Sequence, residues 1–156
     1  MKLRTRLVAL IGIGAAATAI AYVPQFEGMV LRGYKDPIGI VTACAGHTST
    51  AVLGKPYTRE ECQRLLELDL IEHARGVVNC VPVEKLTQGR KAAATSFAFN
   101  VGVRKFCEST FAEKLRAGDP DACAELSRWT YAGGKQLPGL VTRRRTERAI
   151  CEGGVE

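Results

Sequence analysis

The most informative stretch of this chain is "EGMVLRGYKDPIGIVTACAGHT", residues 27–48. It carries Glu27, then Asp36 and Thr42, among glycines and turn-forming residues. Glycines mixed with β-branched residues over 33–54 are typical of a small twisted hairpin or three-stranded sheet, and a short helix is expected over 25–32. The stretch therefore predicts that a helix end carrying one acid faces a hairpin carrying another acid and a hydroxyl.

The rest of the chain shows mainly helix signals. A Thr-x-x-Glu capping box appears twice, an Asp-Pro pair opens another helix, and Gly153-Gly154 ends the last one. The expected helices run from Thr58 to about Arg75, over 87–100, from Thr110, from Asp119 to about Trp129, and over 139–151, with a loop at 131–139. The predicted fold class is α+β with helix dominant, a small β region against a helical body.

The N-terminus has the pattern of an export signal. Lys2, Arg4 and Arg6 precede an uncharged run over 7–26, which as a helix would span about 30 Å, the thickness of a hydrocarbon core. The run is a cleaved signal peptide if Ala19-Ile20-Ala21 is a cleavage site, and otherwise an anchor. A core helix is the remaining alternative. We expect an anchor segment over 1–24 and one folded domain over 25–156.

That anchor would be weak. Eight of the eighteen residues over 7–24 are Gly or Ala, and each gains much less from lipid than a leucine would. A weak anchor can hold a protein at the membrane and later release it. Deleting residues 2–21 is then expected to leave a soluble protein.

The charge balance indicates which classes of molecule this chain could bind. The chain has 22 basic and 16 acidic residues, a formal net charge of +6, which favours acidic partners. Nucleic acid is disfavoured because the chain lacks a C-x-x-C pair, an RNP-like aromatic run and a phosphate-loop pattern. The basic residues near the C-terminus form either a solvated helix face or a ligand-facing patch, and no metal or cofactor is expected.

Six cysteines stand at widely spaced positions: Cys44, Cys62, Cys80, Cys107, Cys123 and Cys151. Their spacing does not suit a zinc site, and an even number behind an export-type start favours disulfides and an oxidising compartment. Buried free thiols are the alternative. Six cysteines allow 15 pairings, and the sequence alone does not choose among them. The favoured set is Cys123–Cys151, joining the last two helices, Cys44–Cys62, joining the β region to the next helix, and Cys80–Cys107 as the pair then left.

Two carboxylates in different surroundings are what glycoside hydrolysis requires, because one must donate a proton and the other must stay ionised. Apolar neighbours favour the neutral acid at Glu27, and the polar turn Tyr-Lys-Asp-Pro favours an ionised Asp36. Thr42 could hold a water beside Asp36. By spacing alone the catalytic signal is weak, because a Glu and an Asp this far apart occur often by chance. A solvated Glu on a helix and an Asp in a turn are the alternative that spacing favours.

The same stretch strongly resembles the catalytic segment of the phage-type lysozymes, the glycoside hydrolase family 24 muramidases. Their pattern is Glu, eight residues, Asp, five residues, Thr, with Tyr-Lys before the Asp and Gly-His after the Thr. The resemblance continues through "YTREECQRLLELDL", "FAFNVG" and "RWTYAGGKQLPGLVTRRRTERAIC", and so covers roughly residues 25–152.

The resemblance implies an α+β lysozyme fold that cleaves the β-1,4 bond between N-acetylmuramic acid and N-acetylglucosamine in peptidoglycan. Glu27 would be the general acid, and Asp36 and Thr42 would position and activate the water. His47 would pair with a buried Asp69 as a structural ion pair, although direct catalysis by His47 is an alternative. Asn100, with Arg143 or Arg144, stands where family members line the cleft, and a capping or surface role is the alternative for these residues. Tyr34, which matches the tyrosine of the pattern, is also expected to bind substrate.

The N-terminus is similar to that of signal-anchor-release endolysins, whose weak membrane segment tethers an inactive enzyme until release. The implied location is the host inner membrane, facing the periplasm, and later the periplasm itself, as a monomer. A cysteine switch within the segment is not expected, since residues 7–26 hold no cysteine.

Two rival functions remain. A lytic transglycosylase uses the acid without water, and Asp36 and Thr42 argue against it. An exported wall-binding or inhibitor protein would not need the Glu-Asp-Thr set.

Overall fold

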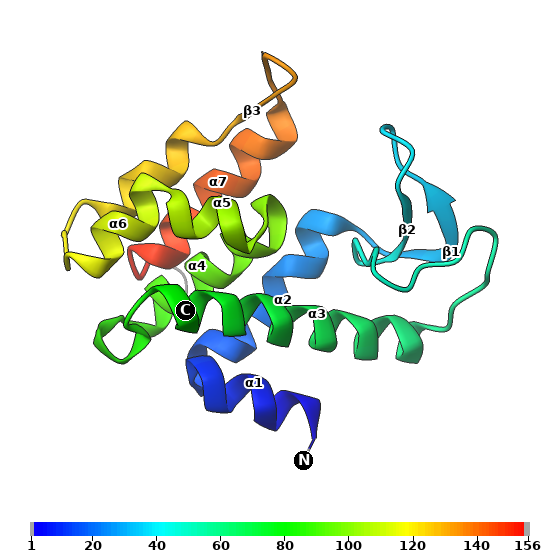
Figure 1. The fold of residues 1–156 in the computed structure, drawn as a ribbon, viewed down its shortest axis with the longest axis horizontal. Helices are drawn as coiled ribbons and strands as arrows, with labels where there is room; N and C mark the ends of the chain where they lie inside the picture. The colour runs from blue at the N-terminus through cyan, green and yellow to red at the C-terminus, as the bar shows by residue number, and fades with distance from the viewer. Residues whose placement is uncertain (1, 155–156) are drawn as a thin grey trace.

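The computed structural model describes residues 2–154, which form a helical body and a small β lobe joined by one long helix (Figure 1). That helix, α3, runs from the body to the β lobe (Figure 1). The elements in chain order are α1 (Leu3–Ile11), α2 (Ile13–Glu27), β1 (Val30–Lys35), β2 (Val41–Cys44), α3 (Arg59–Cys80), η1 (Val83–Lys85), α4 (Gln88–Val101), α5 (Val103–Glu108), α6 (Thr110–Arg116), η2 (Ala122–Arg128), β3 (Tyr131–Ala132), β4 (Lys135–Gln136) and α7 (Pro138–Cys151).

The N-terminal segment is part of the hydrophobic core. Leu7, Ile11 and Val23 are fully buried, and Ala15, Ala16 and Ala19 are at most 2% exposed. Helix α1 packs on α3 and helix α2 packs on α4. The small residues of this segment, which the sequence suggested as a sign of a weak anchor, here allow close helix packing. Deleting residues 2–21 would therefore remove part of the core of the domain, and not a separable tether.

A sharp bend divides this segment. Helices α1 and α2 meet at 117°, and Gly12 lies between them at φ +88°. Gln88 supports the bend, because its Oε1 accepts a hydrogen bond from the backbone N–H of Ala15 at 2.8 Å. Among residues 2–154 no single helix has the length and apolarity of a membrane span, although the bent pair α1 and α2 together meets that test by length and composition.

Helix α2 carries Glu27 as its last residue. Pro24 lies inside the helix, and the chain leaves it at Gly28, at φ +75°. Strand β1 follows almost at once. The expected short helix over 25–32 is therefore wrong in both bounds: its first half is the end of α2 and its second half is strand. Glu27 still stands at a helix end, as the sequence suggested.

The β lobe is built on the antiparallel pair β1 and β2, with Tyr34 opposite Thr42 and a bulge between Val30 and Tyr34. A third extended segment pairs through an isolated bridge between Arg32 and Pro56. Gly33 is required where these segments cross, because a Cβ there would lie 1.9 Å from the backbone oxygen of Val52. The hairpin prediction is confirmed.

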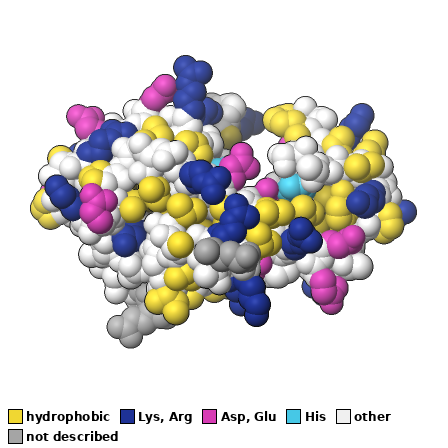
Figure 2. All heavy atoms as spheres, turned by 60° about the horizontal axis from the view of Figure 1, so that its bottom comes forward, with side chains coloured by type: hydrophobic (Ala, Val, Ile, Leu, Met, Phe, Trp, Pro, Cys, Tyr) yellow, Lys and Arg dark blue, Asp and Glu magenta, His cyan; other side chains and the backbone are white. Residues whose placement is uncertain are grey.

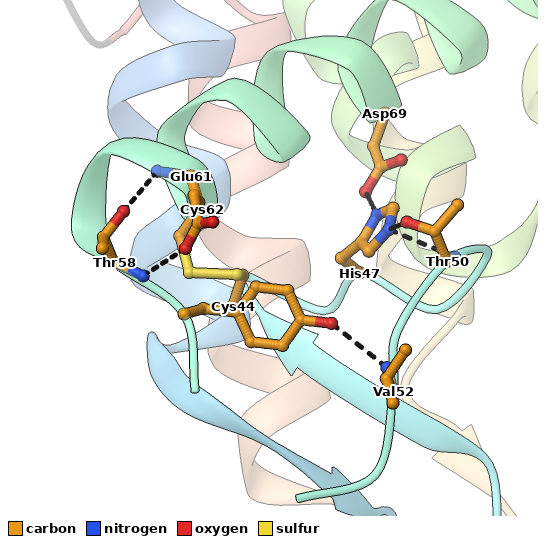
Figure 3. Close-up of a disulfide and its surroundings, with 9 residues drawn as sticks. Cys44, His47, Thr50, Val52, Thr58, Glu61, Cys62 and Asp69 are labelled. Carbon is orange, nitrogen blue, oxygen red and sulfur yellow. Dashed lines mark hydrogen bonds and ion pairs between the residues drawn. A yellow bond between two sulfur atoms is a disulfide. The ribbon is translucent and has the colours of Figure 1, made fainter. Parts of the chain in front are cut away.

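Two connections fix the β lobe to α3 (Figure 3). The first is the disulfide Cys44–Cys62. The second is the hydrogen bond between His47 and Asp69. Helix α3 begins with the predicted capping box, in which Thr58 and Glu61 exchange hydrogen bonds, and the bond from the Thr58 backbone lowers the pKa of Glu61. The helix continues five residues beyond the expected end, from Arg75 to Cys80.

The helical body surrounds α4, whose residues Ala92–Ala98 are all buried. Phe97 packs edge-on against Phe106, Phe111 and Trp129, with ring centroids 5.0–6.2 Å apart. Such edge-to-face pairs stabilise a core beyond the area that they bury.

Three local expectations in the body need correction. Ser109, and not Thr110, caps α6, because the Ser109 side chain accepts from the Ala112 backbone. The helix expected from Asp119 is the 3-10 helix η2, Ala122–Arg128. The expected loop at 131–139 contains the two-residue strands β3 and β4 and the first turn of α7.

The structure contains all three expected disulfides, Cys44–Cys62, Cys80–Cys107 and Cys123–Cys151. They join the β lobe to α3, α3 to α5, and η2 to α7. On the face in Figure 2, basic side chains lie scattered among acidic and apolar ones and do not form one continuous patch. Of the basic residues near the C-terminus, Arg145 is exposed, whereas Arg143 and Arg144 are buried. Neither a solvated face nor a ligand-facing patch therefore describes the whole set.

Candidate active site

Glu27 lies between two hollows in the surface. The first has a volume of about 360 Å³ and is lined by Glu27, Gly46, Thr48, Ser49, Asp69, Glu72, His73, Phe99 and Asn100. The second, of about 630 Å³, is lined by Gln25, Phe26, Glu27, Asn100, Leu137, Pro138, Gly139, Leu140, Thr142 and Arg143. Glu27 and Asn100 belong to both. The side chain of Glu27 is 21% exposed, so its carboxyl can reach a molecule that lies along both hollows.

Arg143 holds Glu27 from the protein side. Its Nη1 donates to Glu27 Oε1 at 2.5 Å, and its Nη2 donates to the backbone oxygen of Ser96 at 3.0 Å. The guanidinium also lies 4.8 Å from the centre of the Phe26 ring. Arg143 is only 4% exposed, although it also lines the second hollow, and its contacts in this structure hold the carboxyl of Glu27.

A fully buried carboxylate lies behind Arg143. Glu147 Oε2 accepts from Ser96 Oγ at 2.6 Å and from Arg143 Nε at 3.5 Å, and Arg144 Nη1 donates to its other oxygen. A buried charge is costly unless it is paired and hydrogen-bonded, and Glu147 meets both conditions. This network fixes the side of α7 that faces Glu27.

Arg144 is not placed at the hollows around Glu27, although it was expected to line the cleft. It is 2% exposed, and it donates to the backbone oxygen of Trp129, to Glu147 and to Oδ1 of Asn100. Burial lowers the pKa of Arg144, and the charge of Glu147 opposes that shift. We therefore assign Arg144 to orienting Asn100, which does line both hollows.

Gly46 allows the β lobe to approach the acid. A Cβ at position 46 would lie 2.8 Å from Glu27 Oε2, and the backbone there has φ +72°. Both the space and the backbone angle require glycine. The loop after β2 can thus place its backbone against the carboxyl of Glu27.

Asp36 and Thr42 lie together on the hairpin. Asp36 Oδ1 accepts from the backbone N–H groups of Ile38 at 3.0 Å and Ile40 at 2.8 Å. Thr42 Oγ1 donates to the backbone oxygen of Ile40 at 3.1 Å. Ile40 therefore links the two side chains. Asp36, Thr42 and the partly exposed Tyr34 line neither hollow beside Glu27.

His47 and Asp69 form a buried pair. His47 Nδ1 lies 2.7 Å from Asp69 Oδ2, and Nε2 lies 2.6 Å from Thr50 Oγ1 (Figure 3). Both ring nitrogens are thus used within the protein, which fits a structural role and leaves none free for direct catalysis. Burial raises the pKa of Asp69, and the hydrogen bond from His47 offsets part of that shift.

Several residues at the site were not identified from the sequence: Glu147, Ser96, Glu72, His73 and Phe99. One signal was present for Glu147, because it follows Arg144 by three residues and Arg143 by four on a helix, the spacing of side chains that meet. Glu72 and His73 follow the predicted Asp69 by three and four residues on α3, and Phe99 precedes the predicted Asn100. The contact of Ser96 with Glu147 joins residues far apart in the chain, and no local pattern indicates it.

The sequence profile of phage lysozymes matches residues 24–147 of this chain. The chain belongs to the phage lysozyme family. It is 42% identical to the SAR-endolysin of Enterobacteria phage P21 over 96% of this chain and 95% of that protein. It is 41% identical to the SAR-endolysin of Bacteriophage PS119 over 96% and 93% of the two chains.

The fold of this phage lysozyme is shared with solved structures. The active form of the P1 phage endolysin Lyz superposes with a TM-score of 0.79 at 19% identity, over 99% of this chain and 95% of that one. At this level of identity the match establishes the fold. It confirms the predicted helix-dominated α+β class, with α1 and α2 included in the superposed part.

Proposed function

We propose that this phage lysozyme is an endolysin in which Glu27 protonates the glycosidic oxygen of the β-1,4 bond between N-acetylmuramic acid and N-acetylglucosamine. Membership of the family makes the chain a muramidase, a glycosidase that degrades peptidoglycan. The observation that supports the role of Glu27 is its position. Among residues 2–154, Glu27 is the one carboxyl that lines both hollows, and it is partly exposed and paired with a buried arginine.

Asp36 and Thr42 would provide the water. A glycosidase that inverts the anomeric carbon needs a second carboxylate on the far face of the sugar, about 6.5–9.5 Å from the acid. Asp36 and Thr42 are joined through Ile40 on the hairpin. One Asp36 oxygen accepts two backbone hydrogen bonds, which hold the carboxylate in place while the other oxygen can accept from water.

Product analysis tests this reaction against its rivals. Purified peptidoglycan is digested with the full chain, and the fragments are analysed by mass spectrometry. Hydrolysis predicts reducing N-acetylmuramic acid ends. Anhydro-muramic ends would instead show a lytic transglycosylase and leave Asp36 and Thr42 without their role. If fragments are absent while binding to walls persists, the chain is a wall-binding protein.

We also propose that the enzyme is first tethered to the host inner membrane through residues 7–26 and then released to the periplasm. The SAR-endolysin names of its relatives support this, and so does an apolar side chain that the folded enzyme does not need. Ile13 is 76% exposed in the structure. An exposed isoleucine contributes little to folding, but in a membrane it would add to the apolar surface of the anchor.

The tethered and folded arrangements would exclude each other. Leu7, Ile11 and Val23 can contact lipid or the protein core, but not both at once. A straight span also requires the bend at Gly12 to open. Since α2 ends in Glu27, a tethered chain would hold the acid at the bilayer surface with part of the core missing, and the enzyme would be inactive.

Introducing a charge at an exposed position within residues 7–26 tests the anchoring role of this segment separately from its role in the folded core. Ala17 is exposed in the fold, so Ala17→Lys should weaken the anchor and leave the folded enzyme intact, with Ala17→Leu as the matched control. Membrane fractionation should find the lysine variant soluble early and the leucine variant retained. If the lysine variant stays in the membrane fraction, the release proposal fails.

A further inference from the structure

His73 lies in the wall of the smaller hollow, beside the acid. It stands on α3, one turn after Asp69, and shares the hollow with Glu27, Phe99 and Asn100. It belongs to none of the residues that the sequence pattern assigned to the reaction. The side chain is half-buried, so it is held by the protein and open to the hollow at the same time.

The hydrogen bonding of His73 defines its tautomer. Nδ1 lies 2.7 Å from the backbone oxygen of Asp69. A carbonyl oxygen only accepts hydrogen bonds, so Nδ1 must carry the proton. In the neutral ring Nε2 is then an acceptor. No other residue among 2–154 makes a hydrogen bond to Nε2, so the acceptor is free for a ligand.

The ring is also fixed in orientation. The centroids of His73 and Phe99 are 5.0 Å apart with an angle of 45° between the ring planes. The imidazole is therefore held by one contact on each of two helices, Asp69 on α3 and Phe99 on α4. A side chain that is ordered before binding loses little entropy when it contacts a ligand.

We propose that His73 is a substrate-binding residue of the cleft, whose Nε2 accepts a hydrogen bond from an N–H or O–H group of the sugar in the smaller hollow. The two rings of His73 and Phe99 form a continuous aromatic wall for the apolar face of that sugar or its acetyl methyl group. This inference rests on the proposed muramidase function and adds a specificity determinant to it. His73 positions the glycan and takes no proton in the reaction.

The lining of the hollow is rich in hydrogen-bond acceptors and therefore suits a ligand that offers donor groups. Glu27 from α2 and Asp69 and Glu72 from α3 contribute carboxyls, while Thr48, Ser49 and Asn100 contribute neutral polar groups. A glycan offers amide N–H and hydroxyl donors, which suit these acceptors and Nε2 together.

Steady-state kinetics on soluble, uncrosslinked peptidoglycan strands test this proposal. His73→Phe keeps an aromatic ring against Phe99 and removes the acceptor, and His73→Gln keeps an acceptor oxygen and removes the ring. We expect His73→Phe to raise KM about tenfold with kcat within about twofold of wild type, as expected for the loss of one ligand hydrogen bond. We expect His73→Gln to recover part of that loss.

Binding in an inactive background gives a second readout. The dissociation constant of the same strands is measured for Glu27→Gln and for Glu27→Gln combined with His73→Phe, together with both melting temperatures. A weaker complex at an unchanged melting temperature supports the proposal. Wild-type KM and an unchanged dissociation constant overturn it. Absence of glycosidase activity in the wild-type chain would instead contradict the proposed function.

Discussion

Arg143 on the last helix donates to Glu27 at the end of α2, with 2.5 Å between Nη1 and Oε1, across 116 positions of sequence. The arginine is itself held by Ser96 on α4 and by Glu147. Three helices thus meet at one carboxyl. The helical body holds the acid on one side, and the backbone at Gly46 approaches it from the other.

Arg143→Lys tests this arrangement. Lysine keeps the charge but cannot donate in a fork to Glu27 and Ser96 together. We expect kcat to fall about 10–100-fold, the usual scale of effect when a reacting group is misplaced by about 1 Å. Activity on peptidoglycan and circular dichroism measure the two consequences. A variant with wild-type kcat would show that Glu27 does not depend on Arg143.

Gly46→Ala should disturb the site from the opposite side. The new methyl group would lie 2.8 Å from Glu27 Oε2 on a backbone at φ +72°. We expect a loss of about 1–2 kcal/mol in unfolding free energy and a larger loss of kcat. Gly118→Ala is the matched control, because Gly118 also has positive φ but a methyl group there would have no atom within 4 Å. Equal effects of the two substitutions on kcat would contradict the close approach of Gly46 to the acid.

Asp69 predicts a pH dependence of stability. Its pKa is raised mainly by burial, so the folded chain binds its proton more tightly than the unfolded chain does. The contribution of Asp69 to the unfolding free energy therefore falls as pH rises from its ordinary pKa through the raised value. Asp69→Asn removes this component.

Denaturant titrations of the wild-type chain and of Asp69→Asn between about pH 3.5 and 7 measure the contribution of Asp69 to the unfolding free energy. This range begins near the ordinary pKa of aspartate. The wild-type unfolding free energy minus that of Asp69→Asn should decrease with rising pH over the window. A difference that increases with pH would mean that the pairing with His47 outweighs burial.

The N-terminal helices should contribute directly to stability. Leu7 is fully buried and Ile13 is 76% exposed. We expect Leu7→Ala to cost about 2–5 kcal/mol and Ile13→Ala to change the unfolding free energy by about 0.5 kcal/mol or less. Chemical denaturation of the released protein measures both. If Leu7→Ala changed the unfolding free energy as little as Ile13→Ala does, α1 would not pack on the body as it does in this structure.

Local features of this chain were easier to predict from the sequence than its packing. The capping box at Thr58 and the hairpin follow from local patterns, and the structure contains both at the expected place. The even number of cysteines favoured disulfides, and the structure contains the three expected pairs, although composition alone does not decide the pairing. The roles of Glu27, Asp36 and Thr42 remain predictions until they are measured.

The N-terminal run shows why the rest was harder. Residues 7–26 are uncharged and rich in alanine, and these properties suit a membrane anchor and a buried helix pair equally. Only tertiary contacts, such as Gln88 with the backbone of Ala15, distinguish them. The same holds for Arg144, whose neighbours Trp129 and Asn100 are remote in sequence, so that its burial followed from no local pattern.

The most direct test of the central claim is Glu27→Gln in the full chain, assayed on purified peptidoglycan with binding measured in parallel. Glutamine keeps the shape of the side chain and cannot donate a carboxylic proton. We predict that cleavage falls by at least about 10²-fold, the scale of general acid catalysis, while binding to peptidoglycan and the melting temperature persist. A Glu27→Gln enzyme that still cleaves peptidoglycan at near the wild-type rate would contradict the assignment of Glu27 as the acid.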